Sequence, residues 1–143
     1  MNRKAAQIGM TSSWFVDSCG LSRKNVSTAR DVAKLVAAAA RYELIREYST
    51  TPQVSLTRLD SGTQINYLNT NLMLRRDTGW IINLSKTGYL NDAGYSLVLQ
   101  TVIDGRVVDI VLLESYGRYS RVGDANRIKR WIQERVRPAM GKS

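Results

Sequence analysis

WIINLSKTG, at Trp80–Gly88, is an apolar run that ends in a short polar motif. The apolar residues Trp80–Leu84 are typical of a buried strand. Two more apolar runs, Leu97–Ile103 and Val107–Leu113, are joined at Asp104-Gly105, a dipeptide that favours tight hairpin turns. This part of the sequence therefore predicts three consecutive strands, with the polar motif at the end of the first.

Helical patterns lie on both sides of these strands. Thr28 and Asp31 approximate a capping box, and apolar residues repeat behind them at helical spacing to about Tyr42. Ile128 and Trp131 belong to one face of a closing helix. Further expectations are short helices at Asn2–Ile8 and Glu43–Tyr48, a loop at Thr11–Asn25, and a hairpin at Val54–Tyr67. Helices grouped apart from strands predict an α+β fold in which helices cover an antiparallel sheet.

Length and composition bound the class of protein. The chain has 143 residues, which suits one domain, and no apolar run approaches the roughly 20 residues that span a bilayer. The N-terminal residues lack the apolar core of a signal peptide. With no histidine and one cysteine, the chain offers no His ligand and no intramolecular disulfide. We therefore expect no transmembrane segment, no metal and no cofactor.

The chain is strongly basic, with a formal net charge of +9 and a pI near 10.1. Such a balance favours anionic partners such as nucleic acid, anionic lipid or an acidic wall polymer. No zinc-ligand spacing, Gly-rich aromatic strand motif or basic region with heptads accompanies the charge, so a solvated basic face is the favoured interpretation. Arg75 and Arg76 are also expected to be solvated, with attraction of acidic wall polymers as the alternative.

Ser85-Lys86-Thr87-Gly88 is the part of the sequence most informative about chemistry. A K-T-G triplet alone recurs by chance, and its plain interpretation is a strand end with a solvated lysine. Here the triplet follows one apolar strand and precedes two others. Penicillin-recognising enzymes carry a K-T-G motif in this context, together with an S-x-x-K nucleophile motif and an S-x-N motif.

Other segments occur in an order that resembles a known family. They are Asn25–Asp31, Ile45–Thr51, Asn69–Asn71, Asn91–Gly94 and Gly123–Ala125. With the S-K-T-G-Y stretch they closely resemble the low-molecular-mass penicillin-binding proteins, the D-alanyl-D-alanine carboxypeptidases, and above all their D-alanyl-D-alanine endopeptidase branch. The resemblance runs from Met1 to about Ile132. It implies an incomplete β-lactamase/transpeptidase-like fold, of which residues 1–143 are the C-terminal portion of a single domain.

The resemblance also implies roles for the residues of the motif. Lys86 would be catalytic, attracting the substrate carboxylate and supporting proton transfer. Substrate binding would fall to Ser85, Thr87, Gly88 and Tyr89: the Thr87 hydroxyl would bind the same carboxylate, and Gly88 would let the substrate backbone approach. The backbone N–H of Tyr89 would be one donor of an oxyanion hole.

Both partner motifs are missing from the sequence. No serine has a lysine three places on, the nearest cases being Ser27, Ser55 and Ser115 with arginine there, and no S-x-N occurs. In the family both motifs precede the region where this sequence begins. We therefore expect that the chain alone is not acylated by penicillin, because nucleophile and general base are both absent. Without the preceding segment, Leu99, Val111 and Trp131 are expected to lose cover.

Three hypotheses about function remain. The first is a fragment of a serine-type D-alanyl-D-alanine carboxypeptidase or endopeptidase, periplasmic by resemblance, which acts on peptidoglycan cross-links. Its partners would be peptide stems, β-lactams and a missing N-terminal segment. The second is a catalytically inactive module that binds peptidoglycan. The third, a nucleic-acid-binding protein, rests on charge alone, so no nucleic-acid partner is expected.

Structural roles, rather than reactive or binding ones, are expected for the single cysteine and the three tryptophans. Cys19 is expected to be a small buried residue rather than a reactive thiol. Trp14, Trp80 and Trp131 are expected to be aromatics of the core or of a cleft wall.

Overall fold

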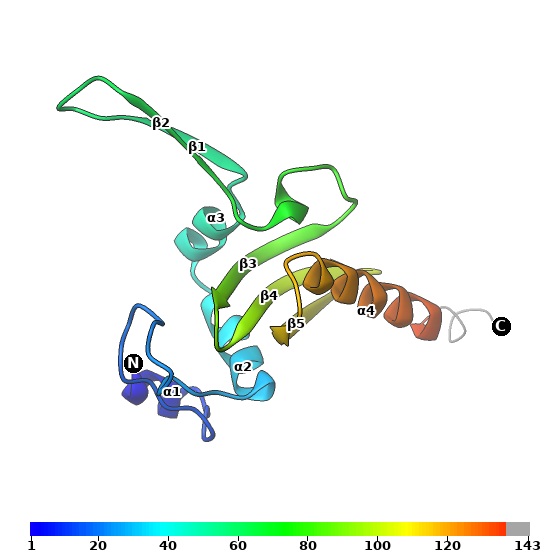
Figure 1. Ribbon diagram of the computed structural model, residues 1–143. Coiled ribbons are helices and arrows are strands. Elements are labelled where there is room, and N and C mark those ends of the chain that lie inside the picture. Colours follow the sequence, from blue (N-terminus) through cyan, green and yellow to red (C-terminus); the bar gives the residue numbers. More distant parts are fainter. Residues whose placement is uncertain (137–143) are drawn as a thin grey trace.

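A three-stranded antiparallel sheet forms the centre of the structure, a computed structural model that describes residues 1–136 (Figure 1). Its strands are β3 (Ile81–Leu90), β4 (Gly94–Ile103) and β5 (Arg106–Ser115), paired in the order β3-β4-β5. Asp104 and Gly105 turn the chain from β4 to β5 with φ angles of 47° and 76°. The predicted hairpin and its turn are confirmed.

β3 is longer than the sequence predicts. The apolar pattern places its end near Leu84, but the strand continues to Leu90 and carries the whole polar motif. Thr87 lies opposite Leu97 and Gly88 opposite Ser96 in the ladder with β4. The backbone pairing extends the strand where the side-chain pattern gives no strand signal, because hydrogen bonds to β4 do not depend on apolar side chains.

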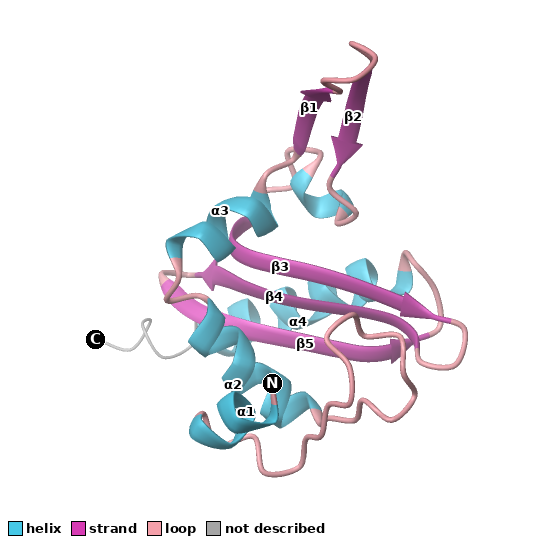
Figure 2. Cartoon of the chain, turned by 90° about the vertical axis from the view of Figure 1, so that its left-hand side faces the viewer, coloured by secondary structure: helices cyan, strands magenta, loops and turns pink. Residues whose placement is uncertain are grey.

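Helices cover both faces of this sheet (Figure 2). α4 (Ser120–Val136) packs against β4 and β5 on one face, and α2 (Ala29–Ala39) and α3 (Glu43–Thr50) lie on the other. The α+β class is thus confirmed. In residues 1–136, no helix has the length and apolar character that crossing a bilayer would require.

The core lies between the sheet and α4. Leu97, Leu99 and Ile103 of β4 are fully buried there, together with Met73, Ile110 and Ala125. The expected loss of cover at Leu99 is therefore wrong, because α4 covers this face of β4. Trp131, farther along α4, has 57% of its surface exposed, as expected.

The N-terminal segment is held against α2 by one buried carboxylate. α1 (Asn2–Gln7) is followed by a loop in which Ser12 N–H and Ser13 Oγ both donate to Asp31 at 2.8 Å. The hydrogen bond from Lys34 outweighs burial and lowers the pKa of Asp31 below its usual value. Thr28 caps α2 as predicted, by accepting the Asp31 N–H. The Asp31 carboxylate thus joins the N-terminal loop to α2.

A separate two-stranded hairpin projects from the body (Figures 1 and 2). This arm consists of β1 (Gln53–Thr57) and β2 (Gln64–Leu68). Val54 lies opposite Tyr67 and Leu56 opposite Ile65, so the arm has an apolar face, yet almost all of its residues are exposed. A short 3-10 helix, η1 (Leu72–Leu74), leads from the arm back toward β3.

Candidate functional site

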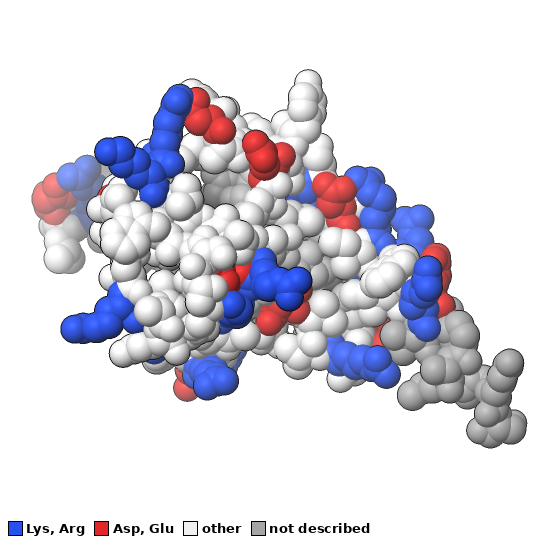
Figure 3. All heavy atoms as spheres, turned by 90° about the horizontal axis from the view of Figure 1, so that it is seen from below, with Lys and Arg blue, Asp and Glu red and all other residues white. Residues whose placement is uncertain are grey.

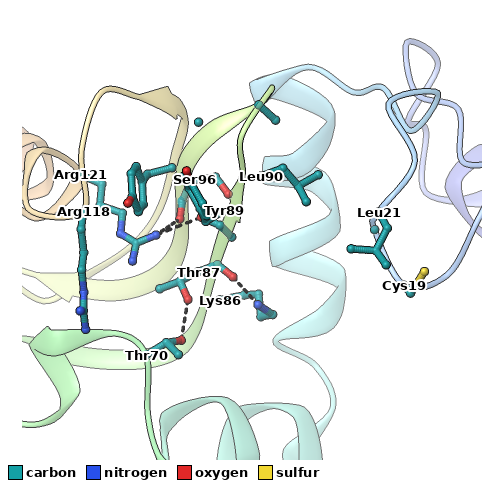
Figure 4. A pocket seen from close by; sticks show the side chains of 15 residues that line it. Cys19, Leu21, Thr70, Lys86, Thr87, Tyr89, Leu90, Ser96, Arg118 and Arg121 are labelled. Carbon is teal, nitrogen blue, oxygen red and sulfur yellow. Dashed lines mark hydrogen bonds between the residues drawn. The ribbon is translucent and has the colours of Figure 1, made fainter.

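The polar motif of β3 lines a cleft at the surface of the central sheet. This cleft has a volume of about 810 Å³ and lies between β3, the turn to β4, the start of α4 and the loop that carries Cys19 (Figure 4). Lys86, Thr87, Gly88 and Tyr89 line it, as does Thr70 from the segment before η1. Ser85 is not among its lining residues and faces a smaller hollow of about 260 Å³.

Alternate residues of the motif differ in exposure. Ser85 and Thr87 are buried, whereas Lys86 is exposed. The Asn71 amide donates to Ser85 Oγ at 2.8 Å, and the hydroxyls of Thr70 and Thr87 lie 2.6 Å apart. Lys86 Nζ donates to the carbonyl oxygen of Thr87. Because Ser85 is buried and already bonded to Asn71, its position favours a structural role.

The segment before η1 holds Thr70 in place beside the motif. Asn69 donates to the carbonyl oxygens of Ser49 and Thr51, at 3.1 and 3.0 Å. On the other side of Thr70, Asn71 is buried and its side chain accepts the Met73 N–H at 3.0 Å. These contacts fix the Thr70 hydroxyl where it meets Thr87.

The edge of β3 that faces away from β4 presents backbone groups to the cleft. Ser85 N–H donates to Ser49 Oγ at 3.3 Å, away from β4. Backbone groups alternate between the two edges of a strand, and the register from Leu84 to Leu90 is uninterrupted. The N–H of Tyr89 therefore faces this same edge, which pairs with no strand in residues 1–136. The geometry leaves that N–H free to donate to a substrate oxygen.

The side chain of Ser96, on the neighbouring strand β4, lies close to Gly88. A Cβ placed on Gly88 would lie 2.4 Å from Ser96 Oγ. Any larger residue would thus force the Ser96 side chain to move. The expectation that Gly88 makes room for a substrate backbone stays a prediction.

A buried arginine that the sequence analysis did not single out lies behind the motif. Arg121, 6% exposed, donates through Nη1 to the carbonyl oxygens of Ser96 and Gly88, at 2.8 and 3.1 Å. Its guanidinium also lies 5.5 Å from the ring centre of Tyr95, which stacks on Tyr89. The one sequence signal was its position four residues before Ala125, which places both on the buried face of α4.

Arg121 keeps its charge in this environment. Burial lowers the pKa of Arg121, the nearby Arg118 lowers it further, and Tyr95 opposes the shift. A guanidinium is not deprotonated in proteins, so a positive charge stays beside the motif. The cleft thus combines the cations Lys86, Arg118 and Arg121 with the Thr87 hydroxyl, which suits a carboxylate.

Hydrogen bonds to the Asp17 carboxylate, rather than burial, order the loop that carries Cys19. Asp17 accepts the N–H groups of Gly20 at 2.6 Å and Ser22 at 2.8 Å. Burial raises the pKa of Asp17, but the hydrogen bonds from Gly20, Asn25 and Ser22 outweigh it and lower the pKa to about 2. Cys19 is exposed and its thiol donates to Asp17, so the expectation that it is buried is wrong. The side chain is free of the core because this loop crosses the surface at the cleft.

The tryptophans are divided between two environments. Trp80 packs against the core cluster, as expected. Trp14 and Trp131 are more than half exposed and lie outside both the core cluster and the lining of the cleft, which corrects that expectation for these two. Residues 1–136 hold no group of three Cys, Asp or Glu placed to share a metal ion.

Comparison with known protein families shows to which family the chain belongs. The family model described as D-alanyl-D-alanine carboxypeptidase matches residues 1–116. The chain belongs to this family. Two curated relatives are D-alanyl-D-alanine endopeptidases: that of Escherichia coli is 42% identical over 133 residues, and that of Pseudomonas aeruginosa is 39% identical over 133 residues. Each alignment covers 93% of this chain and 43% of the relative, so the chain spans less than half the length of both.

Solved structures of the family share the fold. A Streptomyces DD-transpeptidase matches with a TM-score of 0.78 and 27% identity, over 91% of this chain and 51% of the other. A penicillin-binding protein of Listeria monocytogenes, in its cefotaxime-bound form, matches with a TM-score of 0.72 and 26% identity, over 88% of this chain and 50% of the other. The resemblance noted from the sequence is thereby confirmed.

Proposed function

We propose that the chain is the C-terminal portion of a serine-type D-alanyl-D-alanine carboxypeptidase or endopeptidase that acts on peptidoglycan cross-links in the periplasm. In this proposal β3 holds the peptide stem or a β-lactam in the cleft. The nucleophilic serine and its lysine come from a segment outside these 143 residues, because no S-x-x-K occurs within them. Residues 1–143 then belong to one transpeptidase-like domain.

The observation that carries this proposal is the buried guanidinium of Arg121 beside the motif. Only one of its nitrogens is occupied by the carbonyl oxygens of Gly88 and Ser96. A guanidinium has five N–H donors, so others remain for the C-terminal carboxylate of a substrate. The Thr87 hydroxyl, fixed by Thr70, is the neutral donor for the same group.

The remaining groups of the motif suit acyl transfer. With the carboxylate at Thr87, the Tyr89 N–H on the free edge would donate to the carbonyl oxygen under attack. Lys86, exposed in the cleft, would keep a positive charge beside the missing nucleophile. This division assigns binding and half of the oxyanion hole to the present chain, and bond formation to the missing segment.

Reconstitution tests the proposal. The chain would be incubated with a labelled penicillin, alone and together with the part of the Escherichia coli relative that it does not match. We expect no covalent mass increase on the chain alone, and labelling of the added part only when the wild-type chain is present. Thr87→Val should slow labelling about tenfold, as loss of a hydrogen bond to a charged group predicts, whereas Arg106→Gln on β5 should not. A penicilloyl adduct on the chain alone would contradict the proposal.

A second candidate is a catalytically inactive peptidoglycan-binding module. It is favoured by the fact that the groups suited to a carboxylate lie within the chain while the nucleophile motif does not. Binding of a D-alanyl-D-alanine peptide without any support of penicillin labelling would select this alternative.

Nucleic-acid binding stays the weakest of the three hypotheses. On the face seen in Figure 3, Lys and Arg side chains are interspersed with Asp and Glu and form no continuous basic patch. We expect no DNA binding with a steep salt dependence; its observation would revive this hypothesis.

A further inference from the structure

One wall of the cleft is a lobe of the loop between α1 and α2, formed by residues 17–24. The lobe begins after an antiparallel bridge in which Trp14 and Val26 exchange backbone hydrogen bonds of 2.9 Å. Within the lobe, Asp17 accepts the N–H of Gly20 at 2.6 Å, so the lobe has internal order of its own. It is therefore a small closed unit whose two ends are joined at its base.

A single ion pair joins the lobe to the sheet. Apart from this pair, the hydrogen bonds and ion pairs that residues 17–24 make in the described part of the chain stay within residues 17–25. The pair forms between Arg23 of the lobe and Asp92 of the turn from β3 to β4. Both side chains are more than half exposed, at 76% and 52%. An exposed ion pair contributes little free energy, so the contact that holds the lobe opens at low cost.

This ion pair spans one end of the cleft. Cys19 and Leu21 line the cleft from the lobe, and Ala93 lines it from the turn. Arg23 lies two residues after Leu21, and Asp92 lies directly before Ala93, so the pair connects the two walls beside their lining residues. Figure 4 shows Cys19 and Leu21 across from the strand that carries the motif. We call this ion pair the latch.

The latch lies toward the acyl side of a bound peptide. The proposed function places the terminal carboxylate at Thr87 and the carbonyl under attack at the N–H of Tyr89, two residues farther along β3. The rest of the acyl side therefore continues along β3 toward Leu90 and the turn that follows it. This is the end of the cleft at which the latch joins the two walls.

We propose that the latch is a gate that selects ligands by the length of their acyl side. The inference rests on the proposed function, which sets the direction of the peptide. A short acyl group fits the cleft with the latch closed, whereas a long stem has to part the ion pair and move the lobe aside. The free energy that opens the latch is then lost from the binding of a long ligand but not of a short one. Arg23 and Asp92 are thus specificity-determining residues outside the groups that hold the carboxylate.

Two peptides of equal charge test the gate on the full chain. The probes are N-acetyl-D-alanyl-D-alanine and its extended form N-acetyl-L-glutaminyl-L-glutaminyl-D-alanyl-D-alanine, each titrated into the chain and followed by NMR. Arg23→Gln and Asp92→Asn change the net charge in opposite directions. Each should nevertheless strengthen binding of the extended peptide about two- to fivefold relative to the short one, as the size of an exposed ion pair predicts. Added salt should shift the preference of the wild-type chain in the same direction and leave that of both variants unchanged.

Two further variants separate the latch from general effects. Arg23→Asp combined with Asp92→Arg restores an ion pair of reversed polarity and should return the preference to the wild-type value. Arg58→Gln breaks an exposed ion pair with Asp60 in the turn of the arm, outside the cleft, and should leave the preference unchanged.

The single cysteine allows the lobe to be followed without any ligand. One spin label on Cys19 and a second on Val107→Cys, an exposed position of β5, report the distance between lobe and sheet. Electron–electron double resonance should give one narrow distance distribution when the latch is intact and a broader one after Arg23→Gln. The ion pair of reversed polarity should narrow the distribution again.

The outcomes distinguish the gate from the proposed function. An unchanged preference in both single variants, or a distance distribution that does not respond to Arg23→Gln, overturns the gate and leaves the proposed function standing. A shift of preference in only one of the two single variants reflects net charge rather than the latch and overturns the gate as well. If the wild-type chain binds neither peptide, the proposed function fails, and selection by the acyl side fails with it.

Discussion

The central sheet and the arm are built from similar sequence patterns and end in opposite environments. β4 alternates buried residues such as Leu97 and Leu99 with half-buried ones, and α4 covers its apolar face. The arm also places apolar side chains on one face, Leu56 among them, but its strands are exposed and no helix within residues 1–136 packs on it. Alternation therefore indicates a strand with one apolar face, and only tertiary packing decides whether that face contributes to stability.

The largest expected difference between the two regions comes from truncating one leucine in each. Leu99→Ala should lower the free energy of unfolding by about 2 to 5 kcal/mol, because it leaves a cavity under α4. Leu56→Ala, on the exposed face of the arm, should change it by less than about 0.5 kcal/mol. Urea unfolding followed by circular dichroism measures both. Similar losses in the two variants would mean that the arm's apolar face is covered in solution.

Replacing the buried side-chain amide of Asn71, between the arm and the sheet, should give the next largest loss of stability. Asn71→Leu removes the hydrogen bonds to Ser85 Oγ and from Met73 N–H and should cost about 1 to 3 kcal/mol. The matched change on the arm is Asn66→Leu, which removes an exposed contact with Ser55 and should be nearly neutral. Equal costs for the two changes would show that the buried hydrogen bonds of Asn71 contribute no more to stability than the exposed contact in the arm.

Removing the arm should have a smaller effect still. Replacement of residues 53–68 by a short Gly-Ser linker keeps Asn69 and its contacts with Ser49 and Thr51. The midpoint of urea unfolding should stay within the shift that about 0.5 kcal/mol produces. A large loss of stability would show that the arm supports the sheet after all.

The smallest expected effect is local and follows from protonation of Asp17 at low pH. The pKa of Asp17 is lowered from 3.8 to about 2 in the folded chain, so its contribution is fully present above pH 3.8 and is lost as the pH falls through about 2. Amide signals of Gly20 and Ser22, which donate to Asp17, should therefore shift together over this range in NMR spectra. Asp17→Asn should abolish the step. A step with a midpoint near 3.8 in the wild-type chain would show that these hydrogen bonds are not held in solution.

Much of the fold follows from the sequence because its signals are local. The capping box at Thr28, the turn at Asp104-Gly105 and the helical periodicity before Trp131 each depend on residues a few positions apart. Their elements are present in the structure within a few residues of the predicted bounds. The motif of the candidate site was found in the same way, by its position after an apolar run.

What the sequence did not reveal depends on contacts between distant segments. Arg121 is separated by 33 residues from Gly88, whose carbonyl it binds, and nothing near Arg121 in the chain marks that partner. Cys19 looked like a small core residue, but its environment is set by Asp17 and by the course of a surface loop. The extension of β3 through polar residues reflects pairing with β4, which side-chain patterns do not encode.

The contact between Arg121 and the Gly88 carbonyl also has a consequence for synthesis. Translation delivers β3 first and α4 much later, so a nascent chain that has just completed β5 carries the Thr87 hydroxyl but not the buried cation behind it. The cleft reaches its final electrostatic form only once the first turn of α4 has left the ribosome. A chain that ended before Ser120 would keep the whole motif and lack the buried guanidinium that donates to the Gly88 carbonyl.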